Sequence, residues 1–231
     1  MKQIIKISGI AYLLIFISGF YANFAILESL VDLKDPITTT TNIINNHIQF
    51  GYGLIGFVVM VFFDLLLVWS LFKITVTVSK RLSYLASIFR LLHALFFIIG
   101  LIYLFKIYIQ TSNPIISNPL QEEIMILLVN FDILWTIGLM FFAIHLLILG
   151  YLGLKSSTIP STLGILLILA SLGYFIDSSA KLTLEDYSQF KSYFEMGVIL
   201  TGVIGELSFT IWLLFKGFKK MAYQIKSSQS L

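Results

Sequence analysis

Six apolar segments, each long enough to cross a lipid bilayer, are the strongest constraint that this sequence places on its fold. A helix needs about 20 mainly apolar residues to span about 30 Å of hydrocarbon. Backbone polar groups have to be satisfied inside such a segment, so the pattern predicts helices. We therefore expect an all-α fold, an integral membrane bundle of six transmembrane helices. The segments are Ile7–Leu27, Phe50–Phe72, Tyr84–Phe105, Ile124–Leu152, Thr162–Ile176 and Phe194–Phe215.

Composition supports a membrane location. Of the 231 residues, 58% are hydrophobic and 12% are charged, about half the charged share of a typical soluble domain. We expect one domain over residues 1–231, ending in a short basic tail at 216–231. The chain has no cysteine, which excludes disulfides and thiolate metal ligands. The fifth segment is short and is expected to extend. The long fourth segment either tilts or begins with an interfacial turn before Asn130.

Charged residues outside the segments are divided unequally between the two sides of the membrane. One side carries ten basic residues and no acidic residue, whereas the other carries four lysines and nine acidic residues. The positive-inside rule then places both termini in the cytoplasm. We expect a multi-pass protein of the bacterial cytoplasmic membrane, with the lipid bilayer as its partner. The net charge of +3 is explained by these membrane-edge bases and does not indicate nucleic-acid binding. Anionic lipid head groups are expected at the tail lysines Lys216, Lys219, Lys220 and Lys226.

Three carboxylates, one arginine and two histidines lie deep inside the apolar segments. Such residues are tolerated in hydrocarbon when they are paired or face a protected cavity, and they are candidates for function. Five of them are placed in the middle-to-inner third of the membrane by their positions along the helices, at 1.5 Å per residue. These five, our candidate ligand or proton site, are Asp64, Arg90, His93, His145 and Glu206. The sixth, Asp132, is expected at a separate, outer position together with Asn130.

The simplest arrangement pairs Arg90 with Asp64, with Glu206 or with both, because a guanidinium can accept two carboxylates. The same ion pair could simply fix the register of the helices. His93 and His145 near these acids permit a metal site, but the sequence lacks a tight histidine spacing, so we expect no metal and assign no cofactor. Residues Gly51–Gly56 spell G-x-G-x-x-G. This dinucleotide motif requires a preceding strand, and here we expect close helix packing instead.

The order of several short motifs along the chain resembles a bacterial membrane family known as domain of unknown function 4386. They include Asn42-Ile43, Asp64, Phe89-Arg90, the run from His145 to Leu152, Ser156, Ile159-Pro160, Leu163-Gly164, Gly173-Tyr174, Gly205-Glu206, Trp212-Leu213-Leu214 and Gly217. Ser161 departs from the arginine that such sequences often have after the proline. The resemblance implies a multi-pass membrane protein without an assigned activity, and it adds weight to Asp64, Arg90, His145 and Glu206.

Three functions fit these observations. The first is a protein that binds or moves a small ligand or protons at the buried polar residues. The second is an intramembrane enzyme that uses His93, His145 and a carboxylate with a metal or cofactor, and the third is a structural or sensor subunit whose ion pairs only hold the helices together. The sequence does not decide whether the chain is an enzyme, and it names no substrate.

Overall fold

The structure is a computed structural model that describes residues 1–114 and 117–219. Six helical segments in it are long and apolar enough to cross a membrane, so the chain is a multi-pass membrane protein and the predicted fold class is confirmed. The first segment consists of α1 (Lys2–Phe20), the π-helix η1 (Tyr21–Leu27) and α2 (Glu28–Leu30). The last consists of α8 (Tyr187–Val198), the π-helix η2 (Ile199–Val203) and α9 (Ile204–Phe218). The four between them are α4 (His47–Thr75), α5 (Lys80–Gln110), α6 (Asn118–Lys155) and α7 (Ser161–Thr183).

Each observed segment contains the predicted one and is longer than it. The fifth runs on to Thr183, and the sixth begins at Tyr187. The long fourth segment is continuous helix from Asn118, so the alternative with a turn before Asn130 is not what the structure has. A short helix, α3 (Pro36–Asn45), lies between the first two segments and was not anticipated. The tail residues Lys220 and Lys226 lie outside the described residues.

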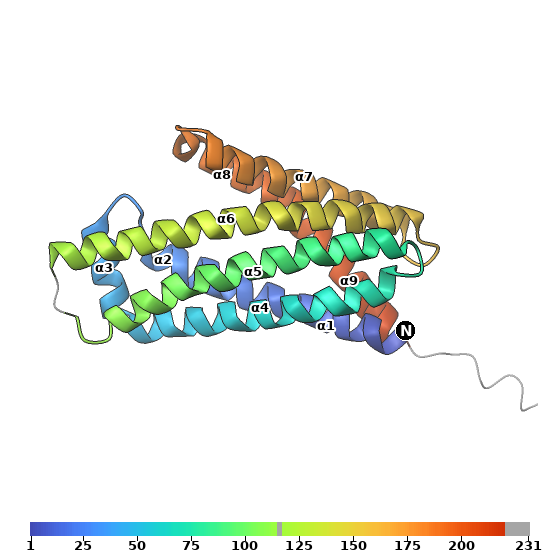
Figure 1. Cartoon of the computed structure of the whole chain (residues 1–231), viewed down its shortest axis with the longest axis horizontal. Coiled ribbons are helices and arrows are strands. Elements are labelled where there is room, and N and C mark those ends of the chain that lie inside the picture. Colours follow the sequence, from blue (N-terminus) through green and yellow to red (C-terminus); the bar gives the residue numbers. More distant parts are fainter. Residues whose placement is uncertain (115–116, 220–231) are drawn as a thin grey trace, which may run out of the picture.

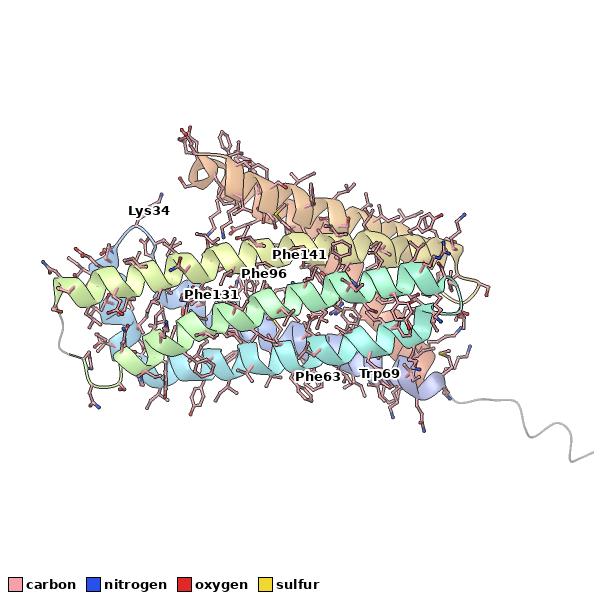
Figure 2. The ribbon with its side chains drawn as sticks, viewed as in Figure 1. Lys34, Phe63, Trp69, Phe96, Phe131 and Phe141 are labelled. Atoms are coloured by element: carbon pink, nitrogen blue, oxygen red, sulfur yellow. The ribbon has the colours of Figure 1, made fainter. Side chains whose placement is uncertain are left out.

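The six segments pack side by side in a ring. In order around it, α1 packs against α4, α4 against α5, α5 against α6 and α6 against α7; α7 packs against η2 and α9, and α9 returns to α1. Bulky apolar side chains such as Phe62 and Ile165 stay exposed on the outside, as expected for a surface that faces lipid. Figure 2 shows side chains standing out along the flanks of the bundle, with Trp69 on α4 among them.

The interior contains two apolar cores. One, near the N-terminus and the end of α9, joins α1, α4, α6, α7 and α9, and includes Leu67, Leu146 and Phe209. The other, near α3, joins the first segment with α3, α4, α5 and α6, and includes no residue of α7, α8 or α9. Figure 1 shows why: α7 and α8 run close to α6 near the α6–α7 turn and diverge from it toward the α7–α8 turn. The bundle is thus closed at the end with the N-terminus and the end of α9, and it opens toward the other end.

Glycines set the closest helix approaches. A Cβ atom on Gly150 would lie 2.7 Å from the carbonyl oxygen of Gly164, and one on Gly164 would lie 2.8 Å from that of Gly150, so α6 and α7 touch backbone to backbone. The G-x-G-x-x-G run also serves packing, as expected: a Cβ on Gly56 would lie 3.1 Å from the carbonyl oxygen of Ser18. Small residues at such contacts are typical of membrane helices.

Candidate functional site

Arg90 is the centre of the buried polar residues. It lies on α5, and 1% of its surface is exposed. Its Nη2 donates to Asp64 Oδ1 on α4 at 2.5 Å, and its Nη1 donates to the hydroxyl oxygen of Tyr12 on α1 at 3.1 Å. The same Nη1 lies 3.1 Å from Nε2 of His145 on α6. One guanidinium therefore connects four helices, and the pairing with a carboxylate offsets part of the cost of burying its charge.

His145 supports Arg90 as a neutral imidazole. Its Nδ1 lies 2.8 Å from the carbonyl oxygen of Ala86, which can only accept a hydrogen bond. Nδ1 therefore carries the proton, and Nε2 is free to accept from Arg90. Both ring nitrogens are used in this way. His145 consequently helps to hold the arginine in place and does not face open space.

His93 lies one turn beyond Arg90 on α5 and contacts the other side of Asp64. Its Nδ1 donates to the carbonyl oxygen of Gly138 at 3.0 Å, and its Nε2 is 3.6 Å from Asp64 Oδ2. The ring lies between the aromatic rings of Phe97 and Phe142, at centroid distances of 4.1 and 4.7 Å. Among the described residues, Asp64 Oδ2 has no hydrogen-bond partner although it is buried. We call Tyr12, Asp64, Arg90, His93 and His145 together the Arg90 cluster.

Glu206 is held separately from this cluster. It lies on α9, three residues after η2 ends, and 7% of its surface is exposed. Tyr174 on α7 donates its hydroxyl to Glu206 Oε1 at 2.8 Å. No basic side chain among the described residues forms an ion pair with Glu206. Of the pairings expected for Arg90, the structure thus contains the one with Asp64 and replaces the one with Glu206 by a tyrosine.

A cavity of about 830 Å³ lies inside the helix ring and ends at these residues. All six membrane segments contribute to its wall, and we call it the central cavity. Four of the five predicted site residues line it, namely Asp64, Arg90, His93 and Glu206, whereas His145 lies behind Arg90. The wall extends to the α2–α3 loop and to α8. Figure 2 shows Lys34 of that loop at the end of the molecule where α7 and α8 diverge from α6.

Asp132 lies in the same cavity, nearer its mouth. It accepts from Lys181 on α7 at 2.5 Å, and both side chains are about one-third exposed (33% and 29%). Asp132, expected at a position separate from the other five and near Asn130, thus lines the same cavity as four of them, and its partner is Lys181. Aromatic rings form much of the remaining wall: Phe97 and Trp135 stack at 4.1 Å with an interplanar angle of 12°, and Phe131 packs against Trp135 at 5.6 Å. The cavity therefore combines a polar closed end with aromatic sides.

Sequence reasoning missed Tyr12 and Tyr174, the two hydroxyls that contact the buried charges. Tyrosine is common at the ends of membrane helices, so its presence alone carried little information. The available signal was depth, because Tyr12 lies well inside the first predicted segment. Ser87, which could be suspected as a nucleophile beside the histidines, donates instead to the carbonyl oxygen of Val68.

The chemistry of the site does not favour a metal centre. Among residues 1–114 and 117–219, no three histidine, aspartate or glutamate side chains converge as a metal would require. The position next to His145 Nε2 that a metal ion would take is occupied by the Arg90 guanidinium. What the arrangement can do is hold a polar group of a small molecule, or a proton, against Asp64, His93 and Glu206.

Comparison with known proteins gives a family but no activity. A family model described as "Domain of unknown function (DUF4386)" matches residues 7–217, which include every residue of the Arg90 cluster and Glu206. An uncharacterized protein from Archaeoglobus fulgidus is 31% identical over 169 residues, covering 73% of this chain and 85% of the relative. No solved structure matches the chain.

Proposed function

The chain belongs to the family described as Domain of unknown function (DUF4386), and from this premise we propose that it binds a small ligand in the central cavity. The observation that carries the proposal is the coincidence of an open cavity with buried polar groups at its closed end. A volume of about 830 Å³ lies within the range of about 300–1,000 Å³ typical of small-molecule sites. We place this function in the cytoplasmic membrane, with the cavity open to the outside.

The roles of the residues follow from their contacts. Arg90 has its Nη atoms bonded to Asp64, Tyr12 and His145, so it fixes the position of the Asp64 carboxylate. Asp64 Oδ2 then stays without a hydrogen-bond donor among the described residues. An unpaired buried oxygen costs about 1–3 kcal/mol, so the Arg90 cluster keeps an unused acceptor close to the cavity wall. His93 and Glu206 lie on the same wall and supply further polar contacts.

A cysteine-accessibility experiment tests this proposal directly, because the natural chain has no cysteine. Val203 lines the cavity, whereas its neighbour Ile204 does not and is 50% exposed on the outside of the bundle. Since thiols react as thiolates, a cysteine in lipid reacts slowly with water-soluble reagents. We expect methanethiosulfonate reagents to modify Val203→Cys in lipid vesicles much faster than Ile204→Cys. Equal, slow labelling of both variants would contradict an open cavity and with it the proposed function.

Ligand binding itself is then measured on Val203→Cys and on the natural, cysteine-free chain. A library of small molecules is screened for compounds that slow the labelling of Val203→Cys and raise the melting temperature of the cysteine-free protein. A true ligand loses both effects when Glu206 is replaced by Gln. The absence of any such compound from a chemically broad library, with a reactive Val203→Cys, would count against a binding function.

A structural role is the second candidate, and one observation favours it. Arg90 joins α1, α4, α5 and α6 through its hydrogen bonds, so the Arg90 cluster would hold these helices together even without a ligand. Glu206 separates the two functions because, among the described residues, its carboxylate has a hydrogen bond from Tyr174 and none from Arg90. A purely structural centre predicts that Glu206→Gln keeps every property of the protein. A ligand site predicts that the variant folds normally and loses binding.

A further inference from the structure

The charges on the wall of the central cavity do not balance. Among the described residues that line it, seven are carboxylates and four are basic. Three of the four bases are already paired with a carboxylate of the same wall. Those pairs are Arg90 with Asp64 at 2.5 Å, Lys181 with Asp132 at 2.5 Å and Lys191 with Glu195 at 3.3 Å. Lys34, the fourth base, lies at the rim on the α2–α3 loop.

The carboxylates without a basic partner are held by neutral donors. Tyr174 donates to Glu206 at 2.8 Å, and Tyr187 donates to Asp177 at 2.7 Å. Glu28 accepts from the side-chain amide of Asn23 at 2.9 Å. A neutral donor orients a carboxylate without cancelling its charge. The wall therefore carries carboxylates without an ion-pair partner among the described residues, from Glu28 and Asp177 to Glu206 at the closed end.

Aromatic rings lie between these charges. Trp135 stacks on Phe97, and Phe142 meets Tyr174 edge to face at 5.4 Å; all four residues line the cavity. The faces of aromatic rings attract cations, and the attraction is stronger where water is excluded. Rings also offer apolar surface to the body of a ligand. The cavity thus combines negative charge with aromatic surface.

From these two observations we propose that the central cavity takes a lipophilic organic cation, an amine or quaternary ammonium on an aromatic or aliphatic body. The cationic group lies at the closed end beside Glu206, and the body lies along the aromatic wall. The charged mouth, with Asp32, Lys34 and Lys191, favours entry from water. This inference rests on the proposed function and adds the class of ligand.

The electrostatic part is tested with two thiol reagents of opposite charge on Val203→Cys. The trimethylammonium-ethyl and sulfonato-ethyl methanethiosulfonates are compared, with each rate divided by the rate for mercaptoethanol in solution. We expect a normalised preference for the cationic reagent of at least about tenfold, since one uncompensated charge at close range supplies more than 1.4 kcal/mol. Glu206→Gln and Asp177→Asn should each reduce the preference.

A ratio near one, or a preference for the anionic reagent, would overturn the inference while the proposed function stands. A Val203→Cys that neither reagent modifies would overturn both. The two failures are thereby distinguishable.

Binding is tested with tetraphenylphosphonium and tetraphenylborate, which have the same shape and opposite charge. We expect tetraphenylphosphonium to raise the melting temperature of the wild-type protein and to slow the labelling of Val203→Cys, with both effects reduced in Glu206→Gln. Protection by tetraphenylborate of equal or greater strength would overturn the proposal. Vesicles with and without aminophospholipid separate the sources of a cation. If Val203→Cys is labelled more slowly in vesicles with aminophospholipid, the bound cation is a lipid head group. If the labelling rates are equal, the bound cation is a compound that enters from water.

Discussion

At the scale of single residues, Arg90 and Asp64 form an ion pair in which both partners are almost fully buried, at 1% and 4% exposure. Removing one partner leaves the other charge without compensation, which costs about 3–5 kcal/mol in protein interiors. Replacing both with apolar residues of similar size removes that cost. We therefore expect Arg90→Met and Asp64→Leu each to lower the melting temperature strongly, and the double variant to recover much of the loss.

The measurement is the thermal midpoint of each purified variant, followed by size-exclusion chromatography after heating. A double variant that loses the sum of the two single effects would show that the two side chains do not depend on each other. The pair would then have no structural coupling, contrary to the 2.5 Å contact.

The sequence predicted which residues gather at this site better than it predicted how they pair. Depth along the helices predicts that Asp64, Arg90 and Glu206 lie at a similar level in the membrane. Their helices α4, α5 and α9 do bring all three to the wall of one cavity. Depth does not fix the rotation of each helix about its axis, so the choice of Asp64 over Glu206 as the arginine's partner was out of reach. Lys181 was assigned to a loop because the fifth segment was predicted to end at Ile176. In the structure, the polar residues after Ile176 continue the helix to Thr183. Lys181 therefore lies on α7, where it reaches Asp132.

At the scale of elements, the contact between α6 and α7 depends on two glycines. A Cβ on Gly150 would meet the carbonyl oxygen of Gly164 at 2.7 Å and Ile168 at 2.8 Å. Backbone atoms cannot move aside separately, so Gly150→Ala should force the helices apart and cost about 1–3 kcal/mol. Gly197 on α8 is the matched control, because nothing lies within 4 Å of a Cβ placed there.

The test is the melting temperature of Gly150→Ala and Gly197→Ala side by side. Gly197→Ala should be neutral or stabilising by about 0.5–1 kcal/mol, the usual gain in a helix interior. Loss of stability in the control comparable to that in Gly150→Ala would refute the packing argument.

Helix α3 offers a pH-dependent prediction outside the membrane segments. The Asp35 carboxylate caps this helix by accepting from the backbone N–H of Thr38 at 3.0 Å and from its hydroxyl at 2.6 Å. The hydrogen bond from the Thr38 hydroxyl, together with that from the backbone, holds the pKa of Asp35 below its usual value. A lowered pKa in the folded state means that the carboxylate stabilises the fold above its unfolded pKa, and that this contribution is lost as pH falls through the folded pKa.

The melting-temperature difference between wild type and Asp35→Ala should therefore be positive at neutral pH and shrink below about pH 4. Asp186 is the control, since it precedes α8 without capping it through its side chain. Asp186→Ala should show no comparable pH-dependent difference. A constant difference for Asp35→Ala down to acid pH would rule out the capping carboxylate as its origin.

At the scale of the whole molecule, the orientation in the membrane decides which compartment the central cavity serves. The structure places the N-terminus and the end of α9 at the closed end of the bundle, and α3 and the α7–α8 turn at the open end (Figure 1). Ten basic residues and no acidic one belong to the side of the termini, which predicts that this side is cytoplasmic. The cavity then opens to the outside, and its ligand comes from there.

Two exposed serines report the orientation in intact cells. Ser112 follows α5 at the open end, and Ser157 follows α6 at the closed end. With an impermeant thiol reagent, Ser112→Cys should be labelled in whole cells, and Ser157→Cys only after the cells are opened. The reverse pattern would place the cavity mouth in the cytoplasm, where the ligand would be an internal metabolite or a compound collected for export. The charge balance of the cavity wall is the same in either orientation, so this measurement assigns the direction of access independently of the class of ligand.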